Sequence, residues 1–124
     1  MRLFKTKAFA RYARSEKIAD KGLREAIARA EKGLIDADLG GGLIKQRVAR
    51  PGQGRSGGFR VIIAFRAAKR SVFLLGFAKN ERANIEDDEL ATLKDLAKAW
   101  LTADDQAIEK AIAAGVLVEV KNED

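Results

Sequence analysis

Two stretches of this 124-residue sequence each contain two basic residues that are separated by an even number of positions. Lys45 and Arg47 stand two positions apart in the first stretch, and Arg60 and Arg66 stand six positions apart in the second. In extended strands, these spacings place the side chains of each pair on one face. The odd positions of the second stretch are all apolar: Phe59, Val61, Ile63 and Phe65. If the two strands pair with their basic faces aligned, four cations line one side of a sheet. Such a surface binds phosphate groups, which an arginine can hold through two parallel hydrogen bonds.

A second group of polar residues follows the next expected strand. Lys79, Asn80, Glu81 and Arg82 are consecutive, and they offer positive charge, hydrogen-bond donors and one carboxylate able to accept a proton. A polar turn before a helix has the same composition, so both interpretations stay open at this point.

The charge is unevenly distributed along the chain. The net charge is +6, from 24 Lys and Arg against 18 Asp and Glu, and the stretch 43–82 holds ten basic residues and a single acidic one, Glu81. Residues 83–124 hold four basic and eleven acidic residues. This asymmetry predicts a body that binds a polyanion, followed by an acidic segment. A basic surface that serves only solubility is the plainer alternative.

The composition excludes several kinds of chemistry. The sequence has no Cys and no His, which rules out disulfides, zinc sites with those ligands, a thiol nucleophile and a Ser-His-Asp triad. We expect no metal and no cofactor. The N-terminus lacks the features of a signal peptide, and no apolar run approaches the ~18 residues of a membrane span. We therefore expect a soluble, cytoplasmic protein that forms a single domain over 1–124 and has no membrane partner.

Residues 51–58 are rich in Pro, Gly and Ser. They contain a G-x-G-x-x-G pattern at Gly52, Gly54 and Gly57, but a dinucleotide site needs a helix directly after the glycines, and here a β-rich run follows. We therefore predict a long, mobile hairpin loop whose Arg55 can close over a backbone phosphate.

Hydrophobic periodicity predicts the elements that must position these side chains. We expect a short strand over 2–5, a first helix with Phe9 and Tyr12 on one face, and a second helix capped by Ser15 and ended near Gly33. The apolar face of the second helix is Leu23, Ile27, Ala30 and Leu34. Three strands are expected next, at 43–48, 58–66 and 70–77, with a tight turn at 67–69.

We expect the last third of the chain to be helical over 86–115, a segment that is rich in acidic residues. Asp87 and its acidic neighbours suit a helix N-terminus, and the apolar stripe of this helix is Leu90, Leu93, Ala97, Trp100 and Leu101. We expect Thr102 to cap a second short helix that ends at Gly115, and 116–120 to be either a final strand or a segment that binds a partner. The element order predicts an α+β fold, with a small antiparallel sheet, two N-terminal helices packed on it and helices at the C-terminal end.

Three runs of residues resemble a known family. The run Gly58-Phe59-Arg60-Val61-Ile62, the run from Phe77 to Arg82 and the run from Lys45 to Gly52 are similar to the RelE/HigB branch of the RelE/ParE toxin superfamily. The resemblance covers 2–101 and is specific mainly across 43–85. It implies a small sheet flanked by two N-terminal helices and a toxin that cleaves messenger RNA, often in the ribosome, and so inhibits translation. It also implies a cognate antitoxin, which we expect to be a helix-turn-helix DNA-binding protein.

The resemblance assigns roles to individual residues. Arg60 matches the strand arginine that holds the scissile phosphate, and Lys45 and Arg47 match a basic pair on the preceding strand. Lys79 and Arg82 match further catalytic basic groups at the strand end.

Two positions depart from the family pattern. Asn80 stands where some members carry another arginine, and Glu86 stands near where some carry a catalytic tyrosine. The sole tyrosine, Tyr12, lies in the first expected helix.

These residues fit RNA cleavage without a metal, in which the 2′-hydroxyl attacks the adjacent phosphate. Cations fixed around the phosphate stabilise the negative charge of the transition state, while a base and an acid move the protons. Because the chain has no His, the candidates for proton transfer are Lys45, Lys79 and Glu81. We expect other basic residues of the region to bind RNA phosphates: Arg47, Arg50, Arg55 and Arg66.

Two alternatives from other functional classes stay open. The ParE branch has the same fold and poisons DNA gyrase by binding, without nuclease chemistry. A non-catalytic RNA-binding module would use the same basic surface. The clustered basic residues favour the nuclease, whereas the absence of a histidine and of a tyrosine near the site favours the alternatives.

Overall fold

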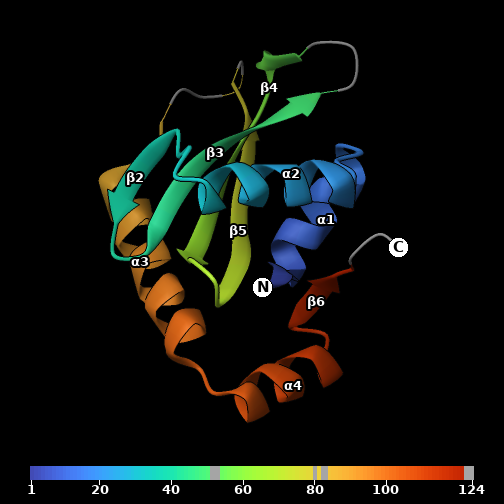
Figure 1. Cartoon of the computed structure of the whole chain (residues 1–124), viewed down its shortest axis with the longest axis vertical. Helices are drawn as coiled ribbons and strands as arrows, with labels where there is room; N and C mark the ends of the chain where they lie inside the picture. Colours follow the sequence, from blue (N-terminus) through green and yellow to red (C-terminus); the bar gives the residue numbers. More distant parts are fainter. Residues whose placement is uncertain (51–53, 80, 82–83, 122–124) are drawn as a thin grey trace.

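The computed structural model describes residues 1–50, 54–79, 81 and 84–121, and for residues 50 and 54–57 it describes the backbone alone. The chain begins with β1 (Arg2–Thr6), α1 (Lys7–Ser15) and α2 (Asp20–Glu31). Four strands follow: β2 (Ala37–Gly40), β3 (Leu43–Arg50), β4 (Gly54–Arg66) and β5 (Arg70–Ala78). The last elements are α3 (Asp87–Thr102), α4 (Asp105–Ala113) and β6 (Leu117–Val120) (Figure 1). The fold is α+β, as the element order predicted.

The described strands form one sheet in the order β2-β3-β4-β5-β1-β6. Neighbouring strands are antiparallel, as predicted, except that β1 lies parallel to β5. Two helices and three further strands separate β1 from β5 along the chain, and a connection of that length allows parallel pairing, which a tight hairpin does not.

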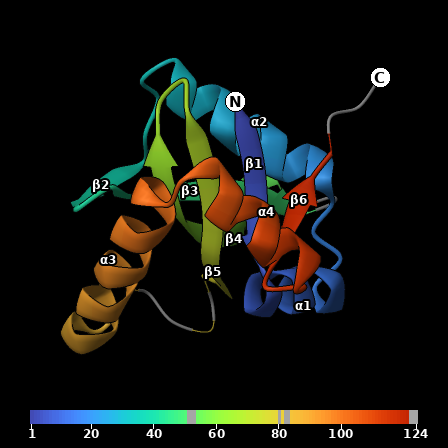
Figure 2. The same cartoon turned by 90° about the horizontal axis from the view of Figure 1, so that it is seen from below.

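Helices cover both faces of this sheet. On one face, α1 and α2 pack against the odd positions of β4 in a first core, which includes Phe9, Leu23, Phe59, Val61 and Ile63. On the other face, α3 and α4 pack in a second core, which includes Leu43, Ile62, Ala64, Leu93 and Ala97. Figure 2 shows the strands between α2 and α3. The predicted apolar face of 59–65 is confirmed, and the predicted apolar stripe of the C-terminal helix covers the opposite face.

The boundary between α1 and α2 differs from the prediction. Ser15 is the last residue of α1, and Ala19, not Ser15, is the N-cap of α2. A turn with Lys17 at φ 59° separates the two helices, so the hydroxyl of Ser15 comes too early to cap the second. The first helix is capped by Thr6, whose hydroxyl accepts a hydrogen bond from Phe9 N at 3.1 Å.

The predicted cap of α4 is also wrong. Thr102 ends α3, and Asp104 accepts the capping hydrogen bond from Ala107 N at 2.8 Å. Leu34, which was expected on the apolar face of α2, lies beyond its end and is 60% exposed, because the helix stops before Gly33 at φ 80°.

The strands extend further than predicted at two places. β4 begins at Gly54, so residues 54–58 of the predicted loop 51–58 are strand, and residues 51–53 lie outside the described part of the chain. Residues 37–40, which were not predicted as a strand, form β2 and pair with the start of β3. The segment 116–120 contains β6, which pairs with β1, so the prediction of a final strand is correct.

Hydrogen bonds connect the C-terminal elements α4 and β6 to the first strand. Arg2 donates to Glu119 of β6 through Nε and Nη2, both at 2.9 Å, and to Glu109 of α4 through Nη1 at 2.8 Å. The hydrogen bonds that the Arg2 guanidinium donates to Glu119 lower the pKa of the Glu119 carboxyl.

Arg70 stabilises the C-terminal end of α3 through hydrogen bonds to its carbonyl groups. This residue is only 5% exposed, and its Nη1 donates to the carbonyl oxygens of Trp100 and Ala103, both at 2.7 Å. Arg70 belongs to the basic stretch 43–82, but its burial gives it a structural role.

None of the helices in the described residues is both long and apolar enough to cross a membrane.

Candidate active site

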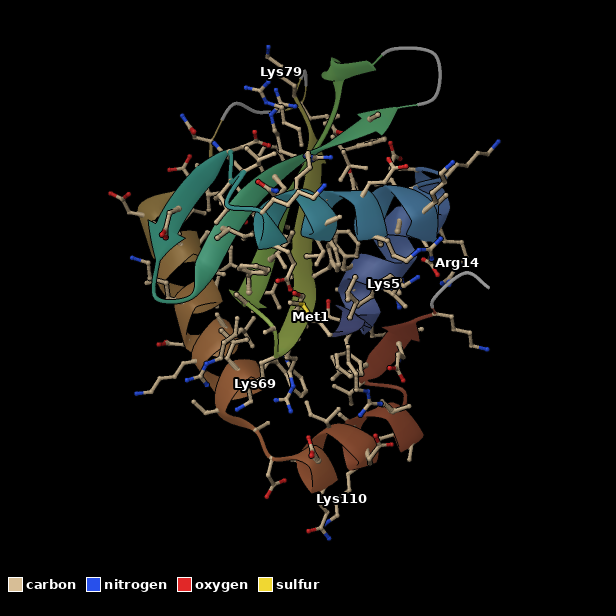
Figure 3. All side chains as sticks on the ribbon, in the orientation of Figure 1. Met1, Lys5, Arg14, Lys69, Lys79 and Lys110 are labelled. Carbon is tan, nitrogen blue, oxygen red and sulfur yellow. The ribbon has the colours of Figure 1, made fainter. Side chains whose placement is uncertain are left out.

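Three basic side chains share one face at one end of the sheet. Arg47 on β3 is directly opposite Arg60 on β4, and Lys45 is opposite Ile62, so all three project to the face that α3 partly covers. The end of β5 lies beside this part of β4, and the exposed Lys79 follows it (Figure 3). We refer to Lys45, Arg47, Arg60 and Lys79 as the basic strand end.

The Arg47–Arg60 pair carries charge that its described surroundings do not neutralise. Directly opposite side chains have Cβ atoms about 4.5–5.5 Å apart, and like charges at that position repel. Neither guanidinium forms an ion pair with a residue that the structure describes. The Nη1 of Arg60 is buried and has no hydrogen-bond partner among these residues. A buried donor without an acceptor costs about 1–3 kcal/mol, so an anion bound here would relieve both penalties.

The backbone of Arg47 is held by side chains from other elements. Its N–H donates to Oδ2 of Asp36 at 2.7 Å, and its carbonyl oxygen accepts a hydrogen bond from Nη2 of Arg29 on α2. β2 pairs only with the start of β3 and does not reach Arg47. The two contacts with Asp36 and Arg29 therefore take the place of strand pairing there. The position of Arg47 is therefore set by α2 and by the segment that precedes β2.

Gln46 is a positioning residue that the sequence reasoning missed. It is fully buried, and its Nε2 donates to Ala26 O at 3.0 Å and Leu34 O at 3.1 Å, while its Oε1 accepts from Asp36 N at 2.7 Å. The available signal was an amide residue between two apolar, inward-facing positions of a strand, because a buried amide requires partners for its donors and acceptor.

Arg60 stands on a rigid part of the sheet. Its neighbours Phe59 and Val61 are 1% and 0% exposed in the first core, and Phe77, opposite Arg60 on β5, is 4% exposed in the second. Packing on both sides of the strand therefore fixes the backbone beneath the guanidinium.

Arg66 lies apart from the basic strand end. It is six residues from Arg60, which corresponds to about 20 Å along a strand. Ile62 and Ala64 lie between them on the same face and are fully buried in the second core, against α3. The predicted row of four cations is therefore interrupted, because α3 covers the middle of that face.

Glu81 closes the turn after β5. Its N–H donates to Ala78 O at 3.0 Å, and its Oε1 accepts from Ala78 N at 3.3 Å. Lys79 and Glu81 are both exposed. No described residue donates a hydrogen bond to Oε2 of Glu81, so this oxygen is available to accept a proton.

Several predicted site residues lie outside the described part of the structure. Asn80 and Arg82 are not described, and neither are the side chains of Arg50 and Arg55. The backbones of the last two belong to β3 and β4, the strands that carry the arginines of the basic strand end.

Tyr12 faces away from the basic strand end. Its ring packs edge-on against Phe59 with the centroids 6.2 Å apart, in the first core. Its Cε2 would lie 2.6 Å from a Cβ at Gly76, so close packing of α1 on β5 requires glycine there. Tyr12 therefore contributes to the packing of α1. Glu86 is exposed at the N-cap of α3.

The described charges of the site suit a phosphate. Cationic groups on rigid strands can hold a phosphodiester and stabilise negative charge that develops on it. Within the described residues, no group of three or more carboxylates is placed to hold a metal ion. Two described carboxylates lie near these cations: Glu81 is two residues from Lys79, and the carboxylate of Asp36 accepts a hydrogen bond from Arg47 N.

Fold and site together define a small α+β protein with a cluster of cationic side chains at one strand end. The family model described as the RelE toxin of the RelE/RelB toxin–antitoxin system matches residues 1–120, from β1 to the end of β6. The chain belongs to this toxin family. This match confirms the resemblance to the RelE/ParE superfamily that was inferred from the sequence. RelE toxins pair with antitoxins.

Proposed function

We propose that this toxin is a ribosome-dependent endoribonuclease that cuts messenger RNA in the cytoplasm and so inhibits translation. The observation that carries this proposal is the Arg47–Arg60 pair, with no ion pair to a described residue and with the buried Nη1 of Arg60 lacking an acceptor. Stable proteins seldom keep such groups without a purpose, and strained charge clusters are typical of functional sites.

The reaction is a transfer within the RNA itself. The 2′-hydroxyl attacks the adjacent phosphorus, the bond to the 5′ oxygen of the next nucleotide breaks, and the products end in a 2′,3′-cyclic phosphate and a 5′-hydroxyl. Arg60 binds the phosphoryl oxygens with its planar fork, and Arg47 adds a second charge from the neighbouring strand. Arg50, Arg55 and Arg82 extend this phosphate contact along the RNA.

Two protons must move during this reaction. Glu81 is the proposed base for the 2′-hydroxyl proton, because it is an exposed carboxylate in the turn that follows β5, two residues from Lys79. Lys45 and Lys79 are the proposed donors to the leaving 5′ oxygen, because both are cations adjacent to the phosphate site.

Glu81→Gln tests the proposed base. The amide keeps an oxygen that can accept the hydrogen bond from Ala78 N, but it cannot take a proton. Cleavage in a translating extract should fall about 100-fold, the lower end of the range for general base catalysis, while the melting temperature stays unchanged. Cleavage at the wild-type rate would show that Glu81 only closes the turn.

RNA binding should depend steeply on salt. Each phosphate contact releases counterions, so affinity falls linearly on a log–log plot with a slope near −0.7 per contact for a single strand. With Lys45, Arg47, Arg60 and Lys79 engaged, we expect a slope of about −3. Filter binding of an uncleavable 2′-deoxy analogue between low and moderate salt measures it, and a slope near zero would contradict a phosphate-dominated interface.

The partner that neutralises the toxin is, in this proposal, a helix-turn-helix DNA-binding antitoxin that covers the basic strand end. Its complementary charge would occupy the Arg47–Arg60 pair in place of RNA. The neighbouring reading frame supplies the candidate.

The proposed function is tested by inducing the chain in growing cells. Translation, measured by amino-acid incorporation, should stop within minutes, and messenger RNAs should gain new 5′ ends inside coding regions. Loss of plasmid supercoiling with sustained translation would replace this function with gyrase poisoning. Inhibition of translation without new 5′ ends would indicate a non-catalytic RNA-binding module.

A further inference from the structure

A second basic feature lies at the opposite end of the α3-covered face. A cavity of about 500 Å³ opens between the β2–β3 turn, the end of β4 and the last turns of α3. Its lining includes Gly42, Arg66, Lys94, Lys98 and Leu101. The nuclease mechanism uses none of these residues.

The wall of this cavity is shaped by the glycine turn. Gly42 has φ +85°, and a Cβ there would come 2.7 Å from Cδ1 of Leu101. A side chain at this position would have to displace the end of the Leu101 side chain, and the positive φ independently favours glycine there. Leu101 and the aliphatic stems of Lys94 and Lys98 provide apolar surface next to the turn.

The charge of the cavity is positive and unpaired. Arg66, Lys94 and Lys98 line it together with one acid, Asp95. None of the three cations forms an ion pair with a residue that the structure describes. Three like charges around one partly apolar cavity repel one another, and a ligand with negative charge would relieve that repulsion.

The cavity suits a peptide better than a single-stranded RNA. Proteins that hold single-stranded RNA stack its bases on aromatic rings. The aromatic residue among the described lining, Phe65, packs its ring against the first core on the other face of the sheet. The cavity is also separated from Arg60 by buried residues under α3, so the two basic features do not form one continuous phosphate track.

We propose that this cavity is a docking site for the cognate antitoxin, and that it takes an acidic segment with an apolar side chain that inserts beside Leu101. Carboxylates of the segment would pair with Arg66, Lys94 and Lys98 at the rim, and the apolar side chain would fill the centre, as anchor residues do in protein interfaces. This inference rests on the proposed function. It gives the antitoxin a contact about 20 Å from the phosphate site.

The test uses the full-length toxin and, as the probe, the purified protein encoded by the adjacent reading frame. Lys98→Glu should weaken their affinity, measured by calorimetry, at least about tenfold by reversing one charge of the rim. Lys98→Arg should bind as the wild type does. Lys110→Glu is the matched control, because Lys110 is an exposed helical lysine on α4, outside the cavity (Figure 3), and it should also bind normally.

Toxicity in cells that lack the partner separates this inference from the proposed function. Lys98→Glu should inhibit translation as strongly as the wild type and keep its melting temperature, because Lys98 is not part of the nuclease site. If wild type and Lys98→Glu bind the partner equally, the docking site is wrong and the nuclease proposal stands. If Lys98→Glu instead loses RNA affinity and toxicity, the cavity belongs to the RNA path and the inference is overturned. If the wild type neither binds the partner nor inhibits translation, the proposed function fails and the docking site with it.

Discussion

Replacing Arg60 with alanine is expected to slow mRNA cleavage about 100–1000-fold and to abolish growth inhibition, while the protein stays folded. The loss corresponds to removing one preorganised group that stabilises transition-state charge. The melting temperature should hold or rise slightly, because the substitution removes a buried Nη1 without a partner and the repulsion from Arg47. Growth after induction, immunoblots for equal expression and thermal melts of the purified protein check the two halves of the prediction.

Two further variants define what Arg60 contributes. Arg60→Lys should restore only part of the activity, because an ammonium group cannot form the two parallel hydrogen bonds that a guanidinium forms with a phosphate. Arg14→Ala is the matched control, since Arg14 is an exposed arginine on α1, outside the basic strand end (Figure 3). Should Arg60→Ala arrest growth as the wild type does, the phosphate site is placed wrongly, and a binding mechanism such as gyrase poisoning takes precedence.

Replacing Arg70 with methionine is expected to lower the free energy of unfolding by about 3 kcal/mol, because the carbonyls of Trp100 and Ala103 lose a charged donor. That loss corresponds to more than a 100-fold change in the folding equilibrium and to a drop of roughly 10 °C in the melting temperature. Methionine fills much of the aliphatic volume, so the change reports the polar contacts of the guanidinium, which are these two hydrogen bonds and the 3.4 Å ion pair between Nη2 and the exposed Asp105. Urea and thermal unfolding followed by circular dichroism measure it.

An exposed arginine provides the comparison for Arg70. Arg11→Met, on the solvent side of α1, should change stability by no more than about 0.5 kcal/mol. An equally small effect for Arg70→Met would mean that water satisfies the two carbonyls, and that Arg70 does not fasten the end of α3.

Local patterns predicted the strands that carry the site. The residues of 59–65 alternate between the two cores, and turn residues separate β4 from β5, so periodicity and turn signals together located both strands, although β4 starts earlier than predicted. The helix caps were predicted less well. Ser15 and Thr102 have the right chemistry for caps, yet each is the last residue of the preceding helix. Several residues near each boundary can act as caps, and the packing of the helices selects among them.

The same patterns predicted that Lys45 and Arg47 share one face of a strand. The register confirms this arrangement, because it places Arg47 opposite Arg60 and Lys45 opposite Ile62. Gln46, in contrast, was recognisable only as a polar residue at an inward position. Its three hydrogen-bond partners lie in α2 and in the segment between α2 and β2, and none of these positions follows from the sequence of β3.

Strand alternation and family motifs lie within short stretches of the chain, so the residues alone were enough to predict the fold class, the basic strands and the toxin family. Which basic residues lie together depends on long-range packing. Arg60, Arg66 and Arg70 are all basic residues of one β-rich stretch, but α3 separates the second from the first and buries the third beneath its C-terminal end. That outcome depends on where a helix more than twenty residues away in the chain packs, and long-range packing leaves no periodic trace in the strands that it covers.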